Sequence, residues 1–257
     1  MEIWKYYDVT HKEHLLCNPI SVEKINELIT LLALKPGSKV LEIATGKGEF
    51  LIRLVEQYNV SAIGVDLSPN YLGDAKKKAK ERVTNANLTL IEMDGANYKP
   101  ETPESFDLTC CIGASWIYNG HEGTLKYLMT QTKRNGLIVV GEPFWISKPP
   151  KEYFELSEIK YEMFSTHAGN VETGENLGLK LLYTFVSTLD DWDRYLGLQW
   201  YAMDNYAQAH PEDPDLPELL ARLNKEKNQY LKWEREAFGW AIYVFRIRKY
   251  KKKKRKN

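Results

Sequence analysis

Val40-Leu41-Glu42-Ile43-Ala44-Thr45-Gly46-Lys47-Gly48-Glu49-Phe50 is a short apolar run that ends in a loop with two glycines. An apolar run that ends in such a loop is typical of a buried β-strand. A helical pattern of apolar residues follows at once, at Leu51, Leu54, Val55 and Tyr58. Glycine is needed where a backbone turns sharply or where a ligand approaches it closely. The stretch therefore predicts a buried strand, a tight turn and the N-terminus of a helix.

A second predicted strand ends in a carboxylate. The apolar run at 60–65 is followed by Asp66, which lies 18 residues after Gly48. An acidic residue at this place accepts hydrogen bonds from the hydroxyls of a ribose. Two strands, a glycine loop and this carboxylate together predict a nucleoside-binding site.

The loop favours a nucleoside without phosphate groups. A dinucleotide fingerprint has a third glycine three positions after the second, and Leu51 stands at that position. Glu49, in the first turn of the helix, is expected to repel a pyrophosphate. Lys47 does not belong to a P-loop, because the sequence lacks the Gly-Lys-Ser/Thr ending of that motif. A cofactor with an amino-acid end and a sulfonium suits the loop better.

Three more apolar runs continue the pattern of alternating strands and helices, at 88–93, 106–112 and 137–140. Strands that alternate with helices form a parallel sheet covered on both faces. In such sheets ligands bind beyond the carboxyl ends of the strands. The polar or glycine residues predicted at those ends are Thr45, Asp66, Asp94, Gly113 and Glu142.

The first and last parts of the chain differ from this pattern. Asn18-Pro19 is expected to begin the first helix. Beyond residue 150 the sequence predicts a helix at 151–165, a polar loop at 166–178, a strand at 179–187, helices within 189–238 and a last strand at 240–247.

The stretch at 40–50 resembles the first motif of the class I S-adenosylmethionine-dependent methyltransferases, with Ala44 where that family usually has its first glycine. Val65-Asp66-Leu67-Ser68-Pro69 and Met93-Asp94-Gly95-Ala96 are similar to the second and third motifs of the ubiquinone/menaquinone-biosynthesis type, which methylates small molecules. The resemblance implies an α/β, Rossmann-like fold. Its seven-stranded, mostly parallel sheet has helices on both faces, and a helical lid is inserted before the last strand.

The resemblance also implies a division of the chain. Residues 1–36 are expected to form an N-terminal cap and first helix, and residues 37–150 the cofactor-binding core. Residues 151–248 are expected to complete that core and to contain the lid insertion at about 189–238. The last segment, 249–257, is expected to be a basic disordered tail.

S-adenosylmethionine is the cofactor that the resemblance implies, with S-adenosylhomocysteine as its product. The methionine end is expected at Glu42 and at 44–48, the ribose at Asp66, and the adenine at Leu67. The residues at 44–48 are Ala44, Thr45, Gly46, Lys47 and Gly48. The others carried over are Asp94 and Gly95 at the adenine edge and Ile112 and Gly113 on the methionine side. Glu42 and Asp94 also have structural alternatives, a buried salt bridge for Glu42 and a turn or helix cap for Asp94.

The catalytic residue is not identified by any motif. His11, His14 and Glu142 are candidates for a general base, and a lone histidine is more often a surface residue. Aromatic residues after the fourth and fifth strands are candidates for the wall of a substrate pocket, or for ordinary packing. These are Trp116, Tyr118, Phe144 and Trp145.

Composition limits the partners of the protein. The chain has 35 basic and 35 acidic side chains, but nine Lys or Arg and no acid lie between Arg246 and Asn257, which leaves 26 basic against 35 acidic side chains in the rest. The acidic body argues against a nucleic-acid partner, and the tail is interpreted as solvated. Three cysteines without metal-ligand spacing predict no metal site, and no apolar run approaches the length of a membrane span. These features predict a cytoplasmic protein, and the resemblance implies that it methylates a small molecule.

Two other functions stay open at this point. A methyltransferase of RNA or protein would use the basic tail, and a non-catalytic protein would only bind S-adenosylmethionine. Oligomeric state and the accepting atom are not indicated by any pattern.

Overall fold

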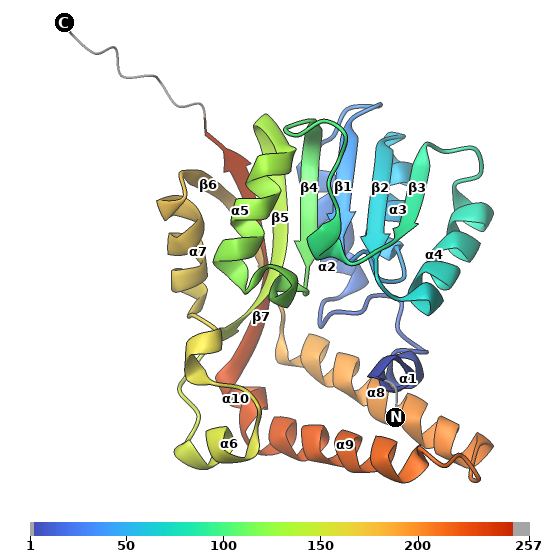
Figure 1. Cartoon of the computed structure of the whole chain (residues 1–257). Coiled ribbons are helices and arrows are strands. Elements are labelled where there is room, and N and C mark those ends of the chain that lie inside the picture. Colours follow the sequence, from blue (N-terminus) through green and yellow to red (C-terminus); the bar gives the residue numbers. More distant parts are fainter. Residues whose placement is uncertain (1–2, 249–257) are drawn as a thin grey trace, which may run out of the picture.

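The protein, in a computed structural model that describes residues 3–248, is built around a seven-stranded sheet in the order β3-β2-β1-β4-β5-β7-β6 (Figure 1). The strands are β1 (Lys39–Ile43), β2 (Ser61–Asp66), β3 (Leu88–Glu92), β4 (Phe106–Ile112), β5 (Thr132–Trp145), β6 (Leu179–Val186) and β7 (Phe238–Ile247). The first five strands are parallel, and β7 is antiparallel to both of its neighbours. The predicted Rossmann-like fold is confirmed.

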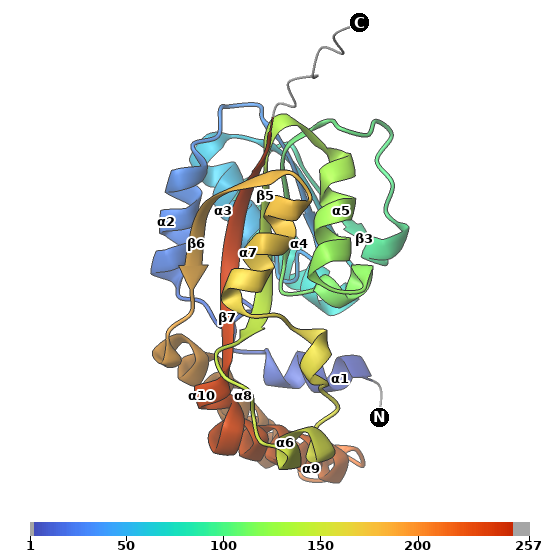
Figure 2. The same cartoon turned by 90° about the vertical axis from the view of Figure 1, so that its left-hand side faces the viewer.

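Helices cover both faces of the sheet, as Figure 2 shows from its edge. The helices are α1 (Ile3–Thr10), α2 (Val22–Leu32), α3 (Glu49–Tyr58), α4 (Pro69–Arg82), α5 (His121–Gln131), α6 (Lys151–Leu156), α7 (His167–Asn176), α8 (Leu189–Ala209), α9 (Leu216–Gln229) and α10 (Arg235–Ala237). The helices α2 and α3 pack on one face, and α5 and α7 pack on the other. Side chains of β1 alternate between these two cores, with Val40 in the first and Leu41 and Ile43 in the second.

A third, smaller core joins segments that are far apart in the sequence. Tyr6 and Val9 of α1 pack against Met203 of α8 and against Leu219 and Leu223 of α9. Figure 1 shows these three helices at the lower end of the molecule, beyond the arrowheads of the central strands. The helical segment between β6 and β7 and the N-terminal helix therefore form one layer over the carboxyl ends of the sheet.

Several local predictions were wrong. The helix predicted at 151–165 ends at Leu156, and only a short 3-10 turn follows at Tyr161–Met163. The segment predicted as a loop, 166–178, contains α7, which Thr166 caps by accepting a hydrogen bond from Gly169 N at 3.1 Å. Gly174 lets this helix lie close to the sheet, because a Cβ there would be 2.5 Å from the ring of Phe245. The first core helix begins at Val22 instead of after Asn18-Pro19. The Ser21 hydroxyl accepts a hydrogen bond from Lys24 N and so caps this helix.

No helix among residues 3–248 is long and apolar enough to cross a membrane. The basic tail at 249–257 lies outside the described residues.

Candidate functional site

A cavity of about 750 Å³ lies where the carboxyl ends of the strands meet the helical layer. Its walls come from the loops after β1, β2, β3 and β4, from the chain between α1 and α2, and from α8. Small-molecule sites have volumes of roughly 300–1,000 Å³ and occur at this end of such sheets. The sequence-predicted residues that line it are His11, Glu42, Ala44, Thr45, Gly46, Lys47, Asp66, Leu67, Asp94, Gly95, Ile112, Gly113 and Trp116.

The loop after β1 turns through left-handed backbone conformations. Ala44, Gly46 and Gly48 have φ values of 56°, 55° and 71°. Ala44 therefore keeps the conformation that a glycine would give at that position. Gly48 lies behind the cavity wall, where a Cβ would be 2.9 Å from Cβ of Ala75. Its small size allows α3 and α4 to pack closely behind the loop.

Asp66 connects this loop to the next strand. Its carboxylate accepts hydrogen bonds from Gly46 N at 2.7 Å and from Ser68 N at 2.9 Å. Burial raises the pKa of Asp66, and the backbone donors oppose that shift. Each carboxylate oxygen retains a lone pair for a further donor. Asp66 therefore fixes the loop and still has acceptor capacity on the cavity side.

Glu42 is a buried carboxyl group at the end of β1. It accepts a hydrogen bond from the Thr45 hydroxyl at 2.6 Å, and no salt bridge forms at it among the described residues. Burial raises the pKa of Glu42 to about 8, with a smaller contribution from the charge of Asp66. A cation that entered the cavity beside Glu42 would stabilise its ionised form.

The loops after β3 and β4 complete this wall. Asp94 accepts a hydrogen bond from Ala96 N at 2.9 Å and so caps the short turn Gly95–Asn97. A Cβ at Gly95 would be 2.6 Å from a methyl group of Ile43. Gly113 has a φ of 82°, and a Cβ there would be 2.0 Å from Asn18 Oδ1. Glycine is required at both positions because the neighbouring chain is so close.

The charges of Lys47 and Glu49 are both compensated by other groups of the protein. The Lys47 ammonium donates to His11 O at 2.8 Å and to Lys12 O at 3.2 Å, and pairs with Asp74 at 3.3 Å. Glu49 pairs with cations of its own helix and of α4, which are Arg53, Lys78 and Arg82. The expectation that Glu49 repels a pyrophosphate was wrong, since its charge is neutralised by these partners.

Of the two histidine candidates, only His11 lines the cavity. His11 Nε2 lies 2.8 Å from the Tyr195 hydroxyl, and His14 Nε2 lies 2.8 Å from the Tyr195 carbonyl oxygen. Burial, then the nearby His14 and Lys47, lower the pKa of His11 to about 3, and burial also lowers the pKa of His14. With this pKa the neutral ring accepts a further proton only weakly near neutral pH, which disfavours a general-base role for His11.

Three of the four predicted aromatic wall residues are packed elsewhere. Trp116 lines the cavity and is 73% exposed. Tyr118 stacks on Tyr127 and donates its hydroxyl to Gly95 O, while Phe144 belongs to the core under α5 and α7. Trp145 is the centre of a separate aromatic cluster. Because β5 is long, Phe144 and Trp145 lie beyond the end of β4. This corrects the prediction that these two residues form a wall of the pocket.

Glu142 also lies outside the cavity. It accepts a hydrogen bond from the Ser115 hydroxyl at 3.1 Å, and its other oxygen is 3.9 Å from His121 Nδ1. His121 Nε2 lies 3.0 Å from the Asn170 carbonyl oxygen, so Nε2 carries the proton of the neutral ring. Burial raises the pKa of Glu142 to about 7 and lowers that of His121 to about 4. The pair is buried outside the cavity, and both groups are neutral only between these two pKa values.

We expect Glu142→Gln to flatten the dependence of stability on pH. The pKa of Glu142 rises from 4.5 to about 7 on folding, so the folded state binds this proton more tightly. Its contribution to stability is greatest below the unfolded pKa and is lost as pH rises towards 7. The variant should therefore gain up to about 3 kcal/mol relative to the wild type over this range. Urea unfolding at pH 4.5 and 7 measures this, and a constant difference between the two proteins would contradict it.

Several cavity residues were not predicted as site residues. They are Tyr7, Cys17, Asn18, Trp192, Tyr195 and Trp240. The aromatic residues of the N-terminus and of the segment at 189–238 were the sequence feature that could have indicated a role in the site. The contacts themselves depend on how α1 and α8 meet in space.

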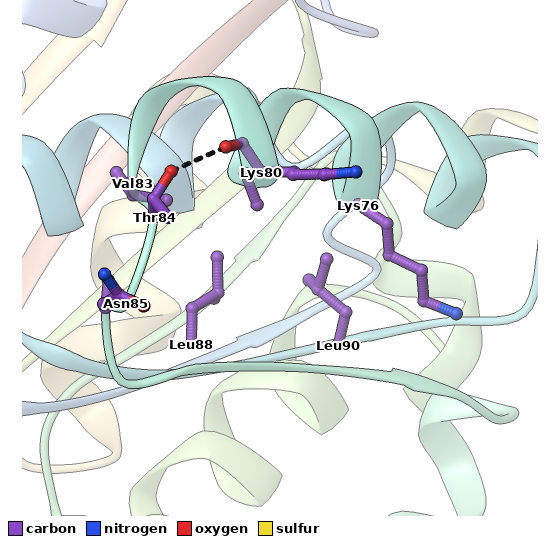
Figure 3. Close-up of a pocket in the computed structure, with 9 residues that line it drawn as sticks. Lys76, Lys80, Val83, Thr84, Asn85, Leu88 and Leu90 are labelled. Atoms are coloured by element: carbon purple, nitrogen blue, oxygen red, sulfur yellow. Dashed lines mark hydrogen bonds between the residues drawn. The ribbon is translucent and has the colours of Figure 1, made fainter.

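A second hollow, of about 330 Å³, lies between the end of α4 and β3. Figure 3 shows Leu88 and Leu90 beneath the side chains of Lys76 and Lys80. The Thr84 hydroxyl, which also lines it, donates to Lys80 O within the helix end. This hollow shares none of its lining residues with the cavity at the strand ends.

Comparisons with known proteins identify relatives of the whole chain. Residues 40–136 match the family model of a methyltransferase domain. The uncharacterized protein YjhP of Escherichia coli is 29% identical over 248 residues, which are 95% of this chain and 98% of that protein. The crystal structure of a SAM-dependent methyltransferase from Geobacter sulfurreducens, in complex with S-adenosyl-L-homocysteine, has a TM-score of 0.88 at 28% identity and covers 95% of this chain and 98% of its own.

A relative that matches about half of the chain has a named activity. The ubiquinone/menaquinone biosynthesis C-methyltransferase UbiE of Rhizobium rhizogenes is 32% identical over 148 residues, which are 54% of this chain and 54% of that protein. The segment matched by the family model runs from β1 to the start of β5, and so contains the loops after the first four strands.

Proposed function

Since this chain is a class I S-adenosylmethionine-dependent methyltransferase, we propose that it transfers the methyl group to a small-molecule acceptor by in-line displacement. The observation that carries the proposal is the cavity at the strand ends, which the helical layer partly covers. With a volume of about 750 Å³ under the layer of α1, α8 and α9, it has room for a cofactor and a small acceptor. A folded RNA or protein would have to displace that layer.

The side chains at the strand ends fit S-adenosylmethionine. Carboxylates suit the hydroxyl and ammonium groups of this cofactor, and the ammonium of Lys47 is engaged by protein oxygens instead of being free for a phosphate. We assign the ribose hydroxyls to Asp66 and the amino-acid end to Glu42 and the loop after β1. The residues proposed to contact the cofactor are Glu42, Ala44, Thr45, Gly46, Lys47, Asp66, Leu67, Asp94, Gly95, Ile112 and Gly113, while Gly48 shapes the loop from behind the cavity wall.

When bound, S-adenosylmethionine supplies an activated methyl group together with a good leaving group. The protein's task is then to align the acceptor with that methyl group, which contributes on the order of 7–11 kcal/mol in well-oriented reactions. In this proposal the loops after β1 and β4 fix the donor side, while residues of α8 and of the segment between α1 and α2 hold the acceptor. The helical layer excludes water from the reacting groups.

We expect binding of S-adenosylhomocysteine to release a proton from Glu42. Burial holds the pKa of this carboxyl at about 8 in the free protein, so most of it is protonated at pH 7. An ammonium group beside it favours the ionised form, and affinity should therefore increase as pH rises towards 8. Calorimetry at pH 7 in two buffers of different ionisation enthalpy measures the proton release. Glu42→Gln should abolish it, and equal release by both proteins would contradict the assignment.

The acceptor class is tested with S-adenosylmethionine that carries a tritiated methyl group. The protein is incubated with this donor and a cell extract, and the products are separated by size. We expect label in the small-molecule fraction. Label in RNA or protein that depends on residues 249–257 would instead support the use of the basic tail.

A further inference from the structure

Part of the cavity lining consists of aromatic and uncharged side chains, which we call the acceptor chamber. It is formed by Tyr7, His11, Cys17, Trp116, Trp192 and Tyr195. These residues come from α1, from the chain that follows it, from the turn after β4, and from α8. None of them is among the residues that we propose to hold the cofactor.

Among the described residues that line the cavity, none places an unpaired charged side chain in the chamber. Lys47 is the cation in that lining, and its ammonium contacts two backbone carbonyls and Asp74. The carboxylate of Glu49 pairs with three cations. Glu42, Asp66 and Asp94 belong to the strand ends. An acceptor with its own charge would therefore lie in the chamber without a counter-charge, which is costly in an apolar site.

His11 is neutral, and its hydrogen bonds define its tautomer. Its Nδ1 lies 3.2 Å from the Tyr7 carbonyl oxygen and 3.0 Å from the Thr10 hydroxyl. The Thr10 hydroxyl donates to the Tyr6 carbonyl at 2.8 Å, so it accepts from Nδ1. A carbonyl oxygen only accepts, which places the proton of the ring on Nδ1 and leaves a lone pair on Nε2.

The tautomer of His11 determines what Tyr195 offers to a ligand. The Tyr195 hydroxyl lies 2.8 Å from His11 Nε2 and donates its proton to that lone pair in preference to the Cys17 carbonyl oxygen, which is 3.4 Å away. The Gln199 amide donates to the Tyr195 oxygen, which leaves that oxygen one lone pair for a ligand. A molecule in the chamber is recognised here if it has a hydrogen-bond donor, such as a hydroxyl group.

We propose that the acceptor chamber takes an uncharged, largely apolar ring compound that presents a hydroxyl group to Tyr195, so that Tyr195 determines specificity for the acceptor. The inference rests on the proposed function, because it assigns the rest of the cavity to the cofactor. Trp116 and Trp192 provide flat apolar surfaces for such a ring. A protonated amine would also contact these rings, but it would lack a carboxylate and lie close to a cationic sulfur.

The test uses four probes of one shape: 2-naphthol, 2-methoxynaphthalene, 2-naphthoate and protonated 2-(aminomethyl)naphthalene. Each is titrated by calorimetry into the full-length protein saturated with S-adenosylhomocysteine. We expect 2-naphthol to bind about 5–10-fold more tightly than 2-methoxynaphthalene, as one hydrogen bond predicts. Both charged probes should bind more weakly than 2-naphthol.

Tyr195→Phe separates the hydrogen bond from packing. The variant should bind 2-naphthol about 5–10-fold more weakly than the wild type does, and its affinity for 2-methoxynaphthalene should be unchanged. Tyr201→Phe, on the same helix but 60% exposed, should change neither probe. Thermal unfolding of both variants confirms that they are folded.

The outcomes distinguish this inference from the function on which it rests. Failure of the wild type to bind S-adenosylhomocysteine would overturn both. If the cofactor product binds but 2-naphthol does not, or if a charged probe binds as tightly as 2-naphthol, the inference on the acceptor is wrong and the proposed function stands. If Tyr195→Phe lost the same amount of affinity for 2-naphthol and for 2-methoxynaphthalene, the inference on the acceptor would also be overturned.

Discussion

Asp66→Ala is expected to weaken binding of S-adenosylhomocysteine by about 100-fold or more. We assign both ribose hydroxyls to this carboxylate, and a hydrogen bond to a charged group contributes about 1.5–3 kcal/mol. The same side chain also accepts from Gly46 N and Ser68 N. Its removal should therefore loosen the loop after β1 as well as remove the ribose contact. Calorimetry on the purified variant measures the loss.

Two further variants separate charge from loop structure. Asp66→Asn keeps the shape of the side chain and one acceptor oxygen, so we expect a smaller loss than in Asp66→Ala. Glu81→Gln removes one carboxylate from the exposed surface of α4, and affinity should not change. If Asp66→Ala bound S-adenosylhomocysteine like the wild type, the ribose assignment would be wrong.

Trp145→Ala is expected to lower the free energy of unfolding by about 3–5 kcal/mol, as is typical when a large aromatic side chain is removed from a core. Trp145 is 3% exposed. Its ring stacks on Tyr161 with centroids 5.7 Å apart and contacts Phe238 at 4.9 Å, and its indole N–H donates to Tyr161 O. Because this cluster lies outside the cavity, affinity for S-adenosylhomocysteine should be unchanged at a temperature where the variant is folded.

Trp116→Ala is the matched control for this prediction. Trp116 is also a tryptophan near the carboxyl end of a central strand, but it lines the cavity and is mostly exposed. We expect little change in the urea midpoint and weaker binding of 2-naphthol. The opposite pattern, with Trp145→Ala losing ligand affinity and keeping its stability, would restore the interpretation of Trp145 as a pocket wall.

The strand-end residues were predictable because their chemistry is local. A parallel sheet places the residue after each strand at one edge, so Thr45, Asp66, Asp94 and Gly113 could be brought together from strand ends alone. The structure places all four at the cavity. Ala44 shows the limit of motif matching, since its φ of 56° keeps the turn without the usual glycine.

The other features depend on contacts between distant segments. The partners of Glu49 lie one turn along α3 and on α4, and a sequence pattern does not show that this charge is neutralised. Tyr195 and His11 are separated by 184 residues yet share a hydrogen bond. Glu142 comes after an apolar run in the same way as Asp66 does, but β5 continues to Trp145 in its pairing with β7. Its side chain is therefore buried within the sheet.

A crystal structure with S-adenosylhomocysteine tests the central claim most directly. We predict that the ribose hydroxyls lie within hydrogen-bond distance of the Asp66 carboxylate, with the amino-acid end on the loop after β1. The sulfur should face the acceptor chamber. A ligand bound away from the strand ends, or one whose ribose does not contact Asp66, would contradict the account.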